Sequence, residues 1–392
     1  MMNKFKLEEK SLDFSFNIRR VSMDSMYIHI PFCNRICTYC DFNKVLIKNQ
    51  PVDDYIEALI QELSAYGDMT LKTIYVGGGT PTALNEAQLN RLLSYVTEHF
   101  KVTDEFTFEA NPDELTTSKL DILKNYGVNR VSLGVQTFNN DLLKVLGRTH
   151  KKDDIFNSIN HLEKIGLTNY SIDLMYNLPG ETFDDIDMSL KYISELKPKH
   201  VSWYSLIIEP NTVFYNKIKA GKMSIAGSIE EGEKYDKVIH GLSALGYPQY
   251  EISNFATKVH ESHHNKTYWL NEPYIGAGAG SHGYTGDVRY YNIKPVNHYI
   301  NSMKDTGSVV KEELKLALKD KYEEEMFLGL RLNKGVSEQR FFDKYNTSID
   351  SIYGKVLKEL HANKLIKRES GFISLTEQGR MIGNDVFAEF LI

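Results

Sequence analysis

The chain has 392 residues, of which 42% are hydrophobic and 25% charged, as expected for a folded protein with a large core and a second domain. Its net charge of -6 excludes a basic overall surface of the kind that binds nucleic acid or anionic membranes. No apolar run approaches the ~18 residues of a membrane span, and the N-terminus has no apolar signal core, so we expect a cytoplasmic protein.

All three cysteines lie in one short stretch. Residues 27–42 read Y-I-H-I-P-F-C-N-R-I-C-T-Y-C-D-F, which places Cys33, Cys37 and Cys40 in a C-x3-C-x2-C pattern. Three thiolates on one loop can hold three irons of a [4Fe-4S] cluster. The fourth iron is then open to a small chelating ligand, and the amine and carboxylate of S-adenosylmethionine suit it.

A disulfide framework and a zinc site fit these cysteines less well. A disulfide framework needs an even number of cysteines in a secreted chain, and a zinc ion would need a fourth ligand such as His29. Three inert buried thiols are a further alternative that fits less well. The alternating stretch Tyr27–Ile30 predicts a strand that ends at Pro31. The cysteines then follow the C-terminal end of a strand, where barrel enzymes place their chemistry.

Strand and helix patterns alternate through the first half of the chain. Strands are predicted at Tyr27–Ile30, Thr73–Val76, Glu105–Glu109, Arg130–Val135, Tyr170–Leu174 and His200–Tyr204. Helices are predicted at Asp53–Tyr66, Asn85–Phe100, Ser118–Tyr126, Asn139–Leu146, Asp153–Ile165 and Asp184–Leu196. This alternation predicts an α/β fold with a parallel sheet curled into a partial (β/α)6 TIM-type barrel.

Ligand-binding residue types fall at the ends of these strands. The run Gly77-Gly78-Gly79-Thr80 follows one strand, and its glycines let the backbone approach a ligand or simply make a tight turn. The side chains Glu109, Gln136 and Asp173 come at or just past three other strand ends, and Arg148 follows on the same side. A carboxylate there can take a ligand ammonium or bind ribose hydroxyls, although each residue alone could be an ordinary ion pair.

The second half begins with a predicted helix at Ser228–Leu245, followed by an irregular stretch. This stretch contains H-N-K-T-Y-W at His264–Trp269, where a histidine beside aromatic rings could bind heme iron or be hydrogen-bonded in a loop. Three helices and a two-strand hairpin are predicted after residue 315 and favour a winged-helix-like unit. From residue 311 onward 14 basic residues face 14 acidic ones, which disfavours DNA binding.

We therefore divide the chain into four parts. They are an N-terminal segment, 1–24; the (β/α)6 core, 25–225; a core extension with the His264–Trp269 loop, 226–305; and the C-terminal winged-helix-like domain, 306–392.

Five motifs occur in order and together resemble one family. They are Y-I-H-I-P-F-C-x3-C-x2-C, G-G-G-T-P-T, E-A-N-P, R-V-S-L-G-V-Q-T-F and D-L-M-Y-N-L-P-G. From about residue 25 to its C-terminus, the chain resembles the radical SAM proteins of the anaerobic coproporphyrinogen III oxidase group. The resemblance implies that residues 25–225 are a radical SAM core.

Two branches of that group differ in function. The oxidases carry a further cysteine two positions after the third, whereas here Cys40 is followed by Asp41 and Phe42. Their N-terminal extension is also longer than the roughly 24 residues found here. The H-N-x-x-Y-W pattern at His264–Trp269 resembles the signature of the heme chaperone branch called HemW. All three features favour the chaperone branch.

The resemblance implies roles at matching positions. The residues implied for the cluster and its S-adenosylmethionine are Cys33, Cys37, Cys40, Tyr27, Gly78, Glu109 and, packing nearby, Tyr39. Residues around a second S-adenosylmethionine in the oxidases correspond to Gly79, Thr80, Gln136, Arg148 and Asp173. Whether the chaperone branch binds this second molecule stays open. His264 is the candidate heme contact.

Two functions of different classes follow. The first is a heme chaperone, which binds heme and passes it to an unidentified acceptor protein while it holds the cluster and exchangeable S-adenosylmethionine. Its other expected partner is a reductant such as flavodoxin or ferredoxin, with no nucleic acid and only weak, peripheral membrane contact through the acceptor. The alternative is an oxygen-independent coproporphyrinogen III oxidase of porphyrin biosynthesis, which uses a 5'-deoxyadenosyl radical.

Overall fold

The structure, a computed structural model, describes residues 23–392. The predicted N-terminal segment, 1–24, lies outside the described residues except for Met23 and Asp24. Within 23–392, no helix is both long enough and apolar enough to cross a bilayer.

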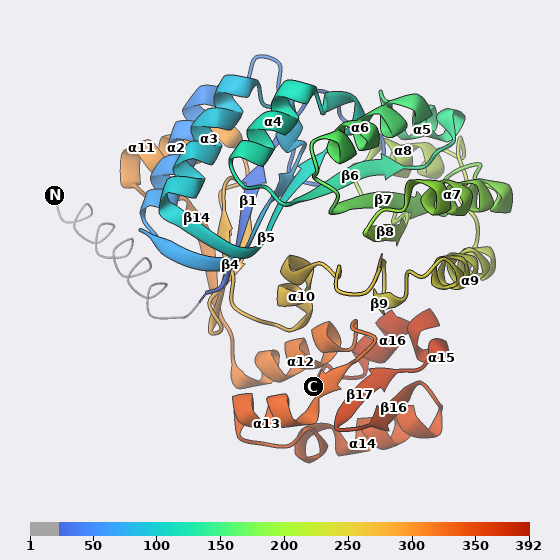
Figure 1. Cartoon of the computed structure of the whole chain (residues 1–392). Coiled ribbons are helices and arrows are strands. Elements are labelled where there is room, and N and C mark those ends of the chain that lie inside the picture. Colours follow the sequence, from blue (N-terminus) through green and yellow to red (C-terminus); the bar gives the residue numbers. More distant parts are fainter. Residues whose placement is uncertain (1–22) are drawn as a thin grey trace, which may run out of the picture.

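Six parallel strands form the centre of the fold (Figure 1). They are β1 (Ser25–Ile30), β4 (Met69–Gly78), β5 (Phe100–Ala110), β6 (Arg130–Gln136), β7 (Tyr170–Tyr176) and β8 (His200–Ser205). All six predicted strands are confirmed. β4 and β5 are longer than expected because their polar first halves pair with each other, from Met69 opposite Phe100 onward.

Three short strands extend the sheet at its two edges. β11 (Ile275–Ala277) pairs parallel with β1, while β10 (Asn254–Ala256) pairs antiparallel with β8 and β9 (Gln249–Glu251) with β10. The strand order is β11-β1-β4-β5-β6-β7-β8-β10-β9. Because β11 and β9 are the two ends of this order, the curved sheet stays open and forms a partial barrel, as the alternation of strands and helices predicted.

Helices cover one side of this curved sheet (Figure 1). They are α2 (Val52–Ser64), α3 (Glu86–His99), α4 (Thr117–Asn125), α5 (Asn140–Leu146), α6 (Lys152–Lys164), α7 (Phe183–Leu196), α8 (Val213–Lys219) and α9 (Ser228–Ala244). Their apolar stripes face the strands; in α2, for example, Tyr55, Leu59 and Leu63 are fully buried in the main core. Burial of these stripes is the main source of stability for such a layer.

The stretch after α9 is more regular than the sequence indicated. It forms helix α10 (His263–Trp269), helix α11 (Val296–Thr306) and a small sheet of β12 (His282–Tyr284), β13 (Val288–Asn292) and β14 (Val310–Lys315). The expected loop at His264–Trp269 is therefore a helix, whose first turn is capped by the Ser262 side chain. In the same stretch, β12 spans only three residues, as do β9, β10 and β11, and such strands are too short to show a periodic pattern.

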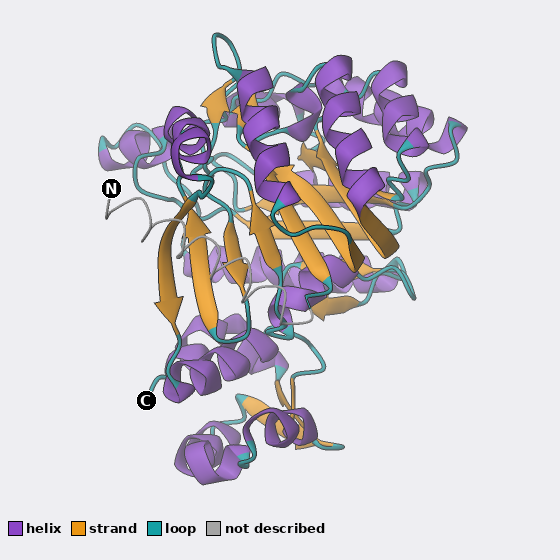
Figure 2. Ribbon diagram, turned by 90° about the vertical axis from the view of Figure 1, so that its left-hand side faces the viewer, coloured by secondary structure: helices purple, strands orange, loops and turns teal. Residues whose placement is uncertain are grey.

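The C-terminal unit has a hydrophobic core of its own. It contains α12 (Leu318–Gly329), β15 (Val336–Ser337), α13 (Glu338–Tyr345), α14 (Ile349–Ala362), β16 (Ile366–Glu369), β17 (Phe372–Leu375), α15 (Glu377–Met381) and α16 (Gly383–Ala388). The three predicted helices and the hairpin are confirmed. Figures 1 and 2 place this unit beneath the sheet, and Figure 1 shows α10 between the two.

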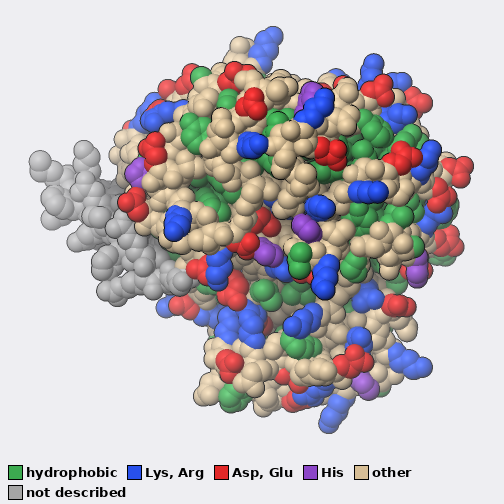
Figure 3. All heavy atoms as spheres, viewed as in Figure 1, with side chains coloured by type: hydrophobic (Ala, Val, Ile, Leu, Met, Phe, Trp, Pro, Cys, Tyr) green, Lys and Arg blue, Asp and Glu red, His purple; other side chains and the backbone are tan. Residues whose placement is uncertain are grey.

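Polar contacts join this unit to the rest of the protein. Arg289 of β13 forms a two-pronged ion pair with Glu324 of α12, at 2.6 and 2.8 Å. Lys344 of α13 donates to the backbone oxygen of Asn271, 3.0 Å away. Basic and acidic side chains are intermixed on the face of the unit shown in Figure 3.

Candidate cofactor site

The cysteine loop follows the C-terminal end of β1. It lies between two short paired strands, β2 (Phe32–Cys33) and β3 (Val45–Leu46). Thr38 anchors the loop: its N–H donates to the oxygen of Leu146 and its hydroxyl to that of Val145, both at 3.0 Å. Its own oxygen accepts from the N–H of Phe214 at 3.1 Å. The end of α5 and the start of α8 therefore hold the loop in place.

Two side chains donate hydrogen bonds to cysteine sulfur. Thr80 Oγ1 lies 3.5 Å from Cys33 Sγ, and Arg148 Nη1 lies 3.6 Å from Cys37 Sγ. Burial raises the pKa of the Cys33 thiol to about 11, and the nearby Cys40 and Cys37 add to the rise. Burial likewise raises the pKa of Cys40. The three thiols thus lie close enough to influence one another, and donors aimed at sulfur suit thiolates that bind iron.

The donor set fits an iron-sulfur cluster better than a single ion. Within residues 23–392, no three His, Cys, Asp or Glu side chains converge on one metal-ion position. A tetrahedral zinc ion needs such convergence. A [4Fe-4S] cluster instead places each thiolate on a different iron, so its ligands stand apart around a larger body. Three thiols of one loop, two of them facing donors, fit that arrangement.

Asn111 connects the two residues that contact sulfur. Its side-chain oxygen accepts from Arg148 Nη2 at 2.5 Å, and its side-chain nitrogen donates to Thr80 Oγ1 at 3.2 Å. Arg148 also donates to the oxygen of Gly134, 2.6 Å away. The sequence pattern did not single out Asn111, although this residue belongs to the E-A-N-P motif; only the fold shows that it joins the two donors.

The glycine run lets three chain segments meet. A Cβ on Gly77 would lie 2.8 Å from the carboxyl carbon of Glu109, and one on Gly79 would lie 2.7 Å from the oxygen of Phe32. Gly78 has a φ of +117°, and its N–H donates to Glu109 Oε2 at 3.0 Å. The glycines therefore make a tight turn that brings β4 against the start of the cysteine loop and against Glu109.

The Glu109 carboxyl group is placed to bind a cation. Its other oxygen accepts from the Tyr75 hydroxyl at 2.8 Å. Burial raises the pKa of Glu109 to about 7, against the opposing effect of the hydrogen bonds from Tyr75 and Gly78. An ammonium group beside it would favour the ionised form, so the residue fits the role expected for holding an amine.

The other predicted site residues occupy the same barrel mouth or the interior below it. The Tyr27 hydroxyl is 3.0 Å from His29 Nδ1. Gln136 ends β6 with a φ of 66° at a register shift between β6 and β7. Such a backbone is uncommon for a residue other than glycine and clusters at functional sites. Tyr39 packs against Phe214, with ring centroids 6.4 Å apart.

Asp173 lies deeper than the sequence indicated. The predicted strand ended at Leu174, but β7 continues to Tyr176. The two carboxylate oxygens accept from the hydroxyls of Ser132 and Ser171, at 2.7 and 2.8 Å. Asp173 therefore belongs to the polar interior of the barrel, below its mouth.

His264 is part of that polar interior and is 1% exposed. Its Nδ1 lies 2.8 Å from Thr73 Oγ1 and its Nε2 lies 2.8 Å from the Tyr268 hydroxyl. Its ring stacks on Tyr75, and burial lowers its pKa to about 4. An axial heme ligand needs a nitrogen lone pair that faces the iron. In this conformation both ring nitrogens are engaged, so heme contact at His264 would require Thr73 or Tyr268 to move away.

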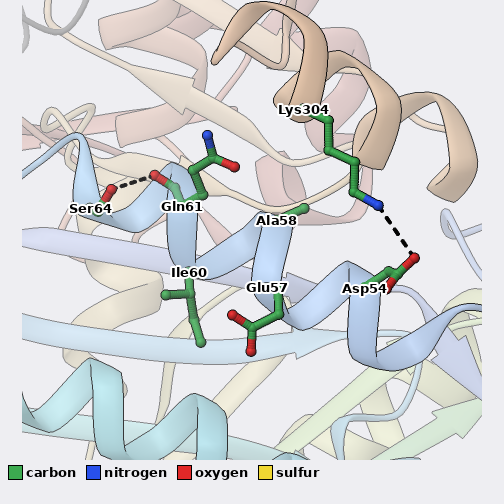
Figure 4. A pocket seen from close by; sticks show the side chains of 7 residues that line it. All are labelled: Asp54, Glu57, Ala58, Ile60, Gln61, Ser64 and Lys304. Atoms are coloured by element: carbon green, nitrogen blue, oxygen red, sulfur yellow. Dashed lines mark hydrogen bonds and ion pairs between the residues drawn. The ribbon is translucent and has the colours of Figure 1, made fainter.

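A separate pocket of about 310 Å³ lies between α2 and α11 (Figure 4). Lys304 crosses it to reach Asp54, 3.4 Å away, while Glu57 and Gln61 line its α2 side. The cysteines and the other predicted site residues do not line this pocket. It is a groove on the outer layer of helices and forms no part of the cofactor site.

Comparisons with known proteins place both parts of the chain in known families. The family model described as the radical SAM superfamily matches residues 27–193, and the one described as the HemN C-terminal domain matches residues 316–382. The solved structure of coproporphyrinogen III oxidase (HemN) from Escherichia coli, described as a radical SAM enzyme, superposes with a TM-score of 0.84. It is 25% identical, and the match covers 96% of this chain and 92% of that one.

Curated relatives match over nearly their whole length. The heme chaperone HemW of Bacillus subtilis (strain 168) is 47% identical, over 94% of this chain and 99% of the relative. The heme chaperone HemW of Lactococcus lactis subsp. lactis (strain IL1403) is 44% identical, over 94% of this chain and 97% of the relative. These matches confirm the resemblance found in the sequence motifs. The chain belongs to the HemW family of the radical SAM superfamily.

Proposed function

We propose that this protein is a heme chaperone, which binds heme and transfers it to an acceptor protein. The observation that carries the proposal is the 47% identity to a protein named heme chaperone HemW over 94% of the chain. At that identity and coverage the two chains share both domains, so the likeness is not limited to the cofactor core.

In this proposal Cys33, Cys37 and Cys40 hold a [4Fe-4S] cluster. The site supports this because the three thiols lie on one anchored loop, with Thr80 and Arg148 donating to two of the sulfurs. Hydrogen bonds to cluster sulfur favour the reduced form, since they stabilise added negative charge. Thr80, Arg148 and Asn111 would therefore set the reduction potential of the bound cluster.

S-adenosylmethionine would dock beside the open iron. Glu109 would bind its amine, with Gly78 presenting its backbone and with Tyr27 and Tyr39 nearby. When bound, this cofactor supplies a sulfonium centre that a reduced cluster can cleave. A second molecule would require Gly79, Thr80, Gln136, Arg148 and Asp173. Thr80 and Arg148 already donate to cysteine sulfur here, which favours a single molecule.

The expected partners follow from this role. They are heme, an acceptor protein whose identity the sequence does not indicate, and a reductant such as flavodoxin or ferredoxin. A cytoplasmic location would keep the cysteines reduced and ready for cluster assembly.

The alternative function is an oxygen-independent coproporphyrinogen III oxidase. The superposition on the Escherichia coli oxidase with a TM-score of 0.84 favours it, because the two folds agree over 96% of this chain. Against it, the oxidases carry a further cysteine two positions after the third, where this chain has Phe42. The Phe42 side chain is 68% exposed beside the cysteine loop.

One experiment separates the two functions. The protein is purified without oxygen, its cluster is reconstituted, and heme is titrated by absorbance; coproporphyrinogen is assayed separately with S-adenosylmethionine and a reductant. We expect stoichiometric heme uptake without porphyrinogen turnover. Steady conversion to protoporphyrinogen would reject the chaperone proposal, and a preparation without iron and acid-labile sulfide would reject the cluster assignment.

A further inference from the structure

A second surface pocket, of about 510 Å³, lies at one end of the small sheet β12-β13-β14 and the start of α11. Its polar lining consists of two imidazoles and two ammonium groups, from His282, His298, Lys294 and Lys311. We call this the imidazole pocket. Its volume is within the roughly 300–1,000 Å³ range of small-molecule sites.

The two histidines of the imidazole pocket differ from His264 in one respect that matters for metal binding. Within the part of the chain that the structure describes, no hydrogen bond engages the ring nitrogens of His282 or His298. By contrast, both ring nitrogens of His264 are bonded internally. A neutral imidazole with a free lone pair is the most common axial ligand of heme iron.

The sheet presents His282 beside an apolar wall that begins with the ring of Tyr291. His282 of β12 lies directly opposite Tyr291 of β13, and their ring centroids are 5.6 Å apart at an interplanar angle of 33°. Ile293 and Pro295 continue this wall after β13. Burial lowers the pKa of His282, with the positive charges of Lys294 and Arg289 adding to the effect.

A β-bulge places one of the lysines. Tyr291 pairs with Glu312 and Asn292 with Val310, so Lys311 is the extra residue between two successive pairs. A bulge re-aims its side chain relative to the regular alternation of a strand. Among the described residues, neither Lys311 nor Lys294 has an acidic partner within salt-bridge distance, so both remain available to a ligand carboxylate.

The imidazole pocket is connected to the cysteine loop. The Asn43 side chain donates to the backbone oxygens of Ala279 and Lys294, at 2.7 and 3.1 Å. The backbone oxygen of Asn43 accepts from His29 Nε2 at 2.8 Å. Asn43, three positions after Cys40, thus fixes the wall of the pocket that carries Lys294.

We propose that the imidazole pocket is the heme site of this protein. His282 binds the heme iron, Lys294 and Lys311 pair with the propionates, and the wall that begins at Tyr291 packs against the macrocycle. This assignment rests on the proposed chaperone function, and it replaces His264 as the heme contact. The connection through Asn43 gives heme at this site a direct structural link to the cysteine loop.

The test is a heme titration of the reconstituted full chain, followed by absorbance, for the wild type and five variants, one of which is His298→Ala alone. His282→Ala is expected to weaken heme binding at least about tenfold and to remove the histidine-ligated spectrum. His282→Ala combined with His298→Ala prevents one imidazole from replacing the other. Lys294→Ala combined with Lys311→Ala should weaken binding about threefold to tenfold while keeping that spectrum. His361→Ala, an exposed histidine of α14, is the matched control and should bind like the wild type.

The outcomes separate this assignment from the proposed function. If the wild type binds heme and the double histidine variant binds it equally well, the imidazole pocket is not the site, although the chaperone function stands. If His298→Ala alone abolishes the histidine spectrum, the assignment of His282 is overturned. If the wild type does not take up heme, the proposed function itself fails.

Discussion

The Asn43 side chain donates a hydrogen bond to the backbone oxygen of Lys294, 251 residues further along the chain, at 3.1 Å. Through this contact the loop that carries the cysteines holds one wall of the imidazole pocket. If cofactor binding orders the loop, the position of the Lys294 backbone should change with it. The two sites are therefore physically coupled.

Asn43→Ala removes both side-chain hydrogen bonds to the wall of the pocket. We expect the free energy of unfolding to fall by about 1–2 kcal/mol, because two carbonyl groups lose a donor. Heme affinity should fall about threefold, since Lys294 is no longer held. Urea denaturation and heme titration measure the two effects. Asn301→Ala, on the exposed side of α11, is the matched control; equal effects of the two substitutions would contradict the coupling.

Thr80→Val removes one hydrogen bond to cysteine sulfur with little change in shape. The reduction potential of the reconstituted cluster should become more negative, because the donor that stabilises added electron density on sulfur is lost. A redox titration followed by absorbance measures the shift. Thr97→Val, on the exposed face of α3, should leave the potential unchanged. An identical potential in Thr80→Val would mean that the hydroxyl does not face the cluster.

Glu109→Gln should change how stability depends on pH. Burial raises the pKa of Glu109 to about 7 in the folded protein, above the usual value of 4.5. Between these two pH values the folded state binds the proton more tightly than the unfolded state. The contribution of Glu109 to the free energy of unfolding is therefore complete below pH 4.5 and is lost as the pH rises to 7. Over this range the free energy of unfolding changes with pH by about -1.4 kcal/mol per pH unit at most.

Urea denaturation of cluster-free protein at several pH values between 5 and 8 measures this slope. Gln has one acceptor oxygen where Glu has two, so the variant also loses a partner for Tyr75 or Gly78 at every pH. That loss shifts the whole curve and leaves its slope unaffected. The expected result is a flatter curve for Glu109→Gln; parallel curves would show that Glu109 titrates normally.

Gly79→Ala should displace the start of the cysteine loop. The new Cβ would lie 2.7 Å from the oxygen of Phe32 and 2.9 Å from the carbonyl carbon of Pro31, and backbone atoms cannot rotate away. We expect lower stability and less iron per chain after reconstitution. Gly354→Ala in α14 meets no atom within 4 Å and should be stabilised by up to about 1 kcal/mol. Full iron content in Gly79→Ala would contradict the close packing of this turn.

His264→Ala tests the two assignments of the heme ligand. The substitution leaves Thr73 and Tyr268 without their shared buried partner, so the free energy of unfolding should fall by about 2–4 kcal/mol. Below its melting temperature the variant should bind heme within about twofold of the wild type. A large loss of heme affinity in well-folded protein would restore His264 as the heme contact.

Much of the fold could be predicted because its elements are long and regular. The six central strands are apolar runs followed by Gly, Pro or polar residues, and the helices between them carry an apolar stripe every three to four residues. Prediction failed between β9 and β13 for a physical reason. Strands of three residues such as β10 and β11 exist only because the edges of a distant sheet pair with them.

The sequence by itself determined the chemistry of the cofactor site: three cysteines at fixed spacing after a strand, with no other thiol in the chain. Tertiary structure alone decided which side chains contact the sulfurs and which histidines remain free. His264 meets Thr73, 191 positions away, and so becomes a buried partner, while His282 opens onto a pocket. Hydrogen-bond partners so far apart in the chain leave no local pattern, because only the packing of the sheet and α10 brings them together.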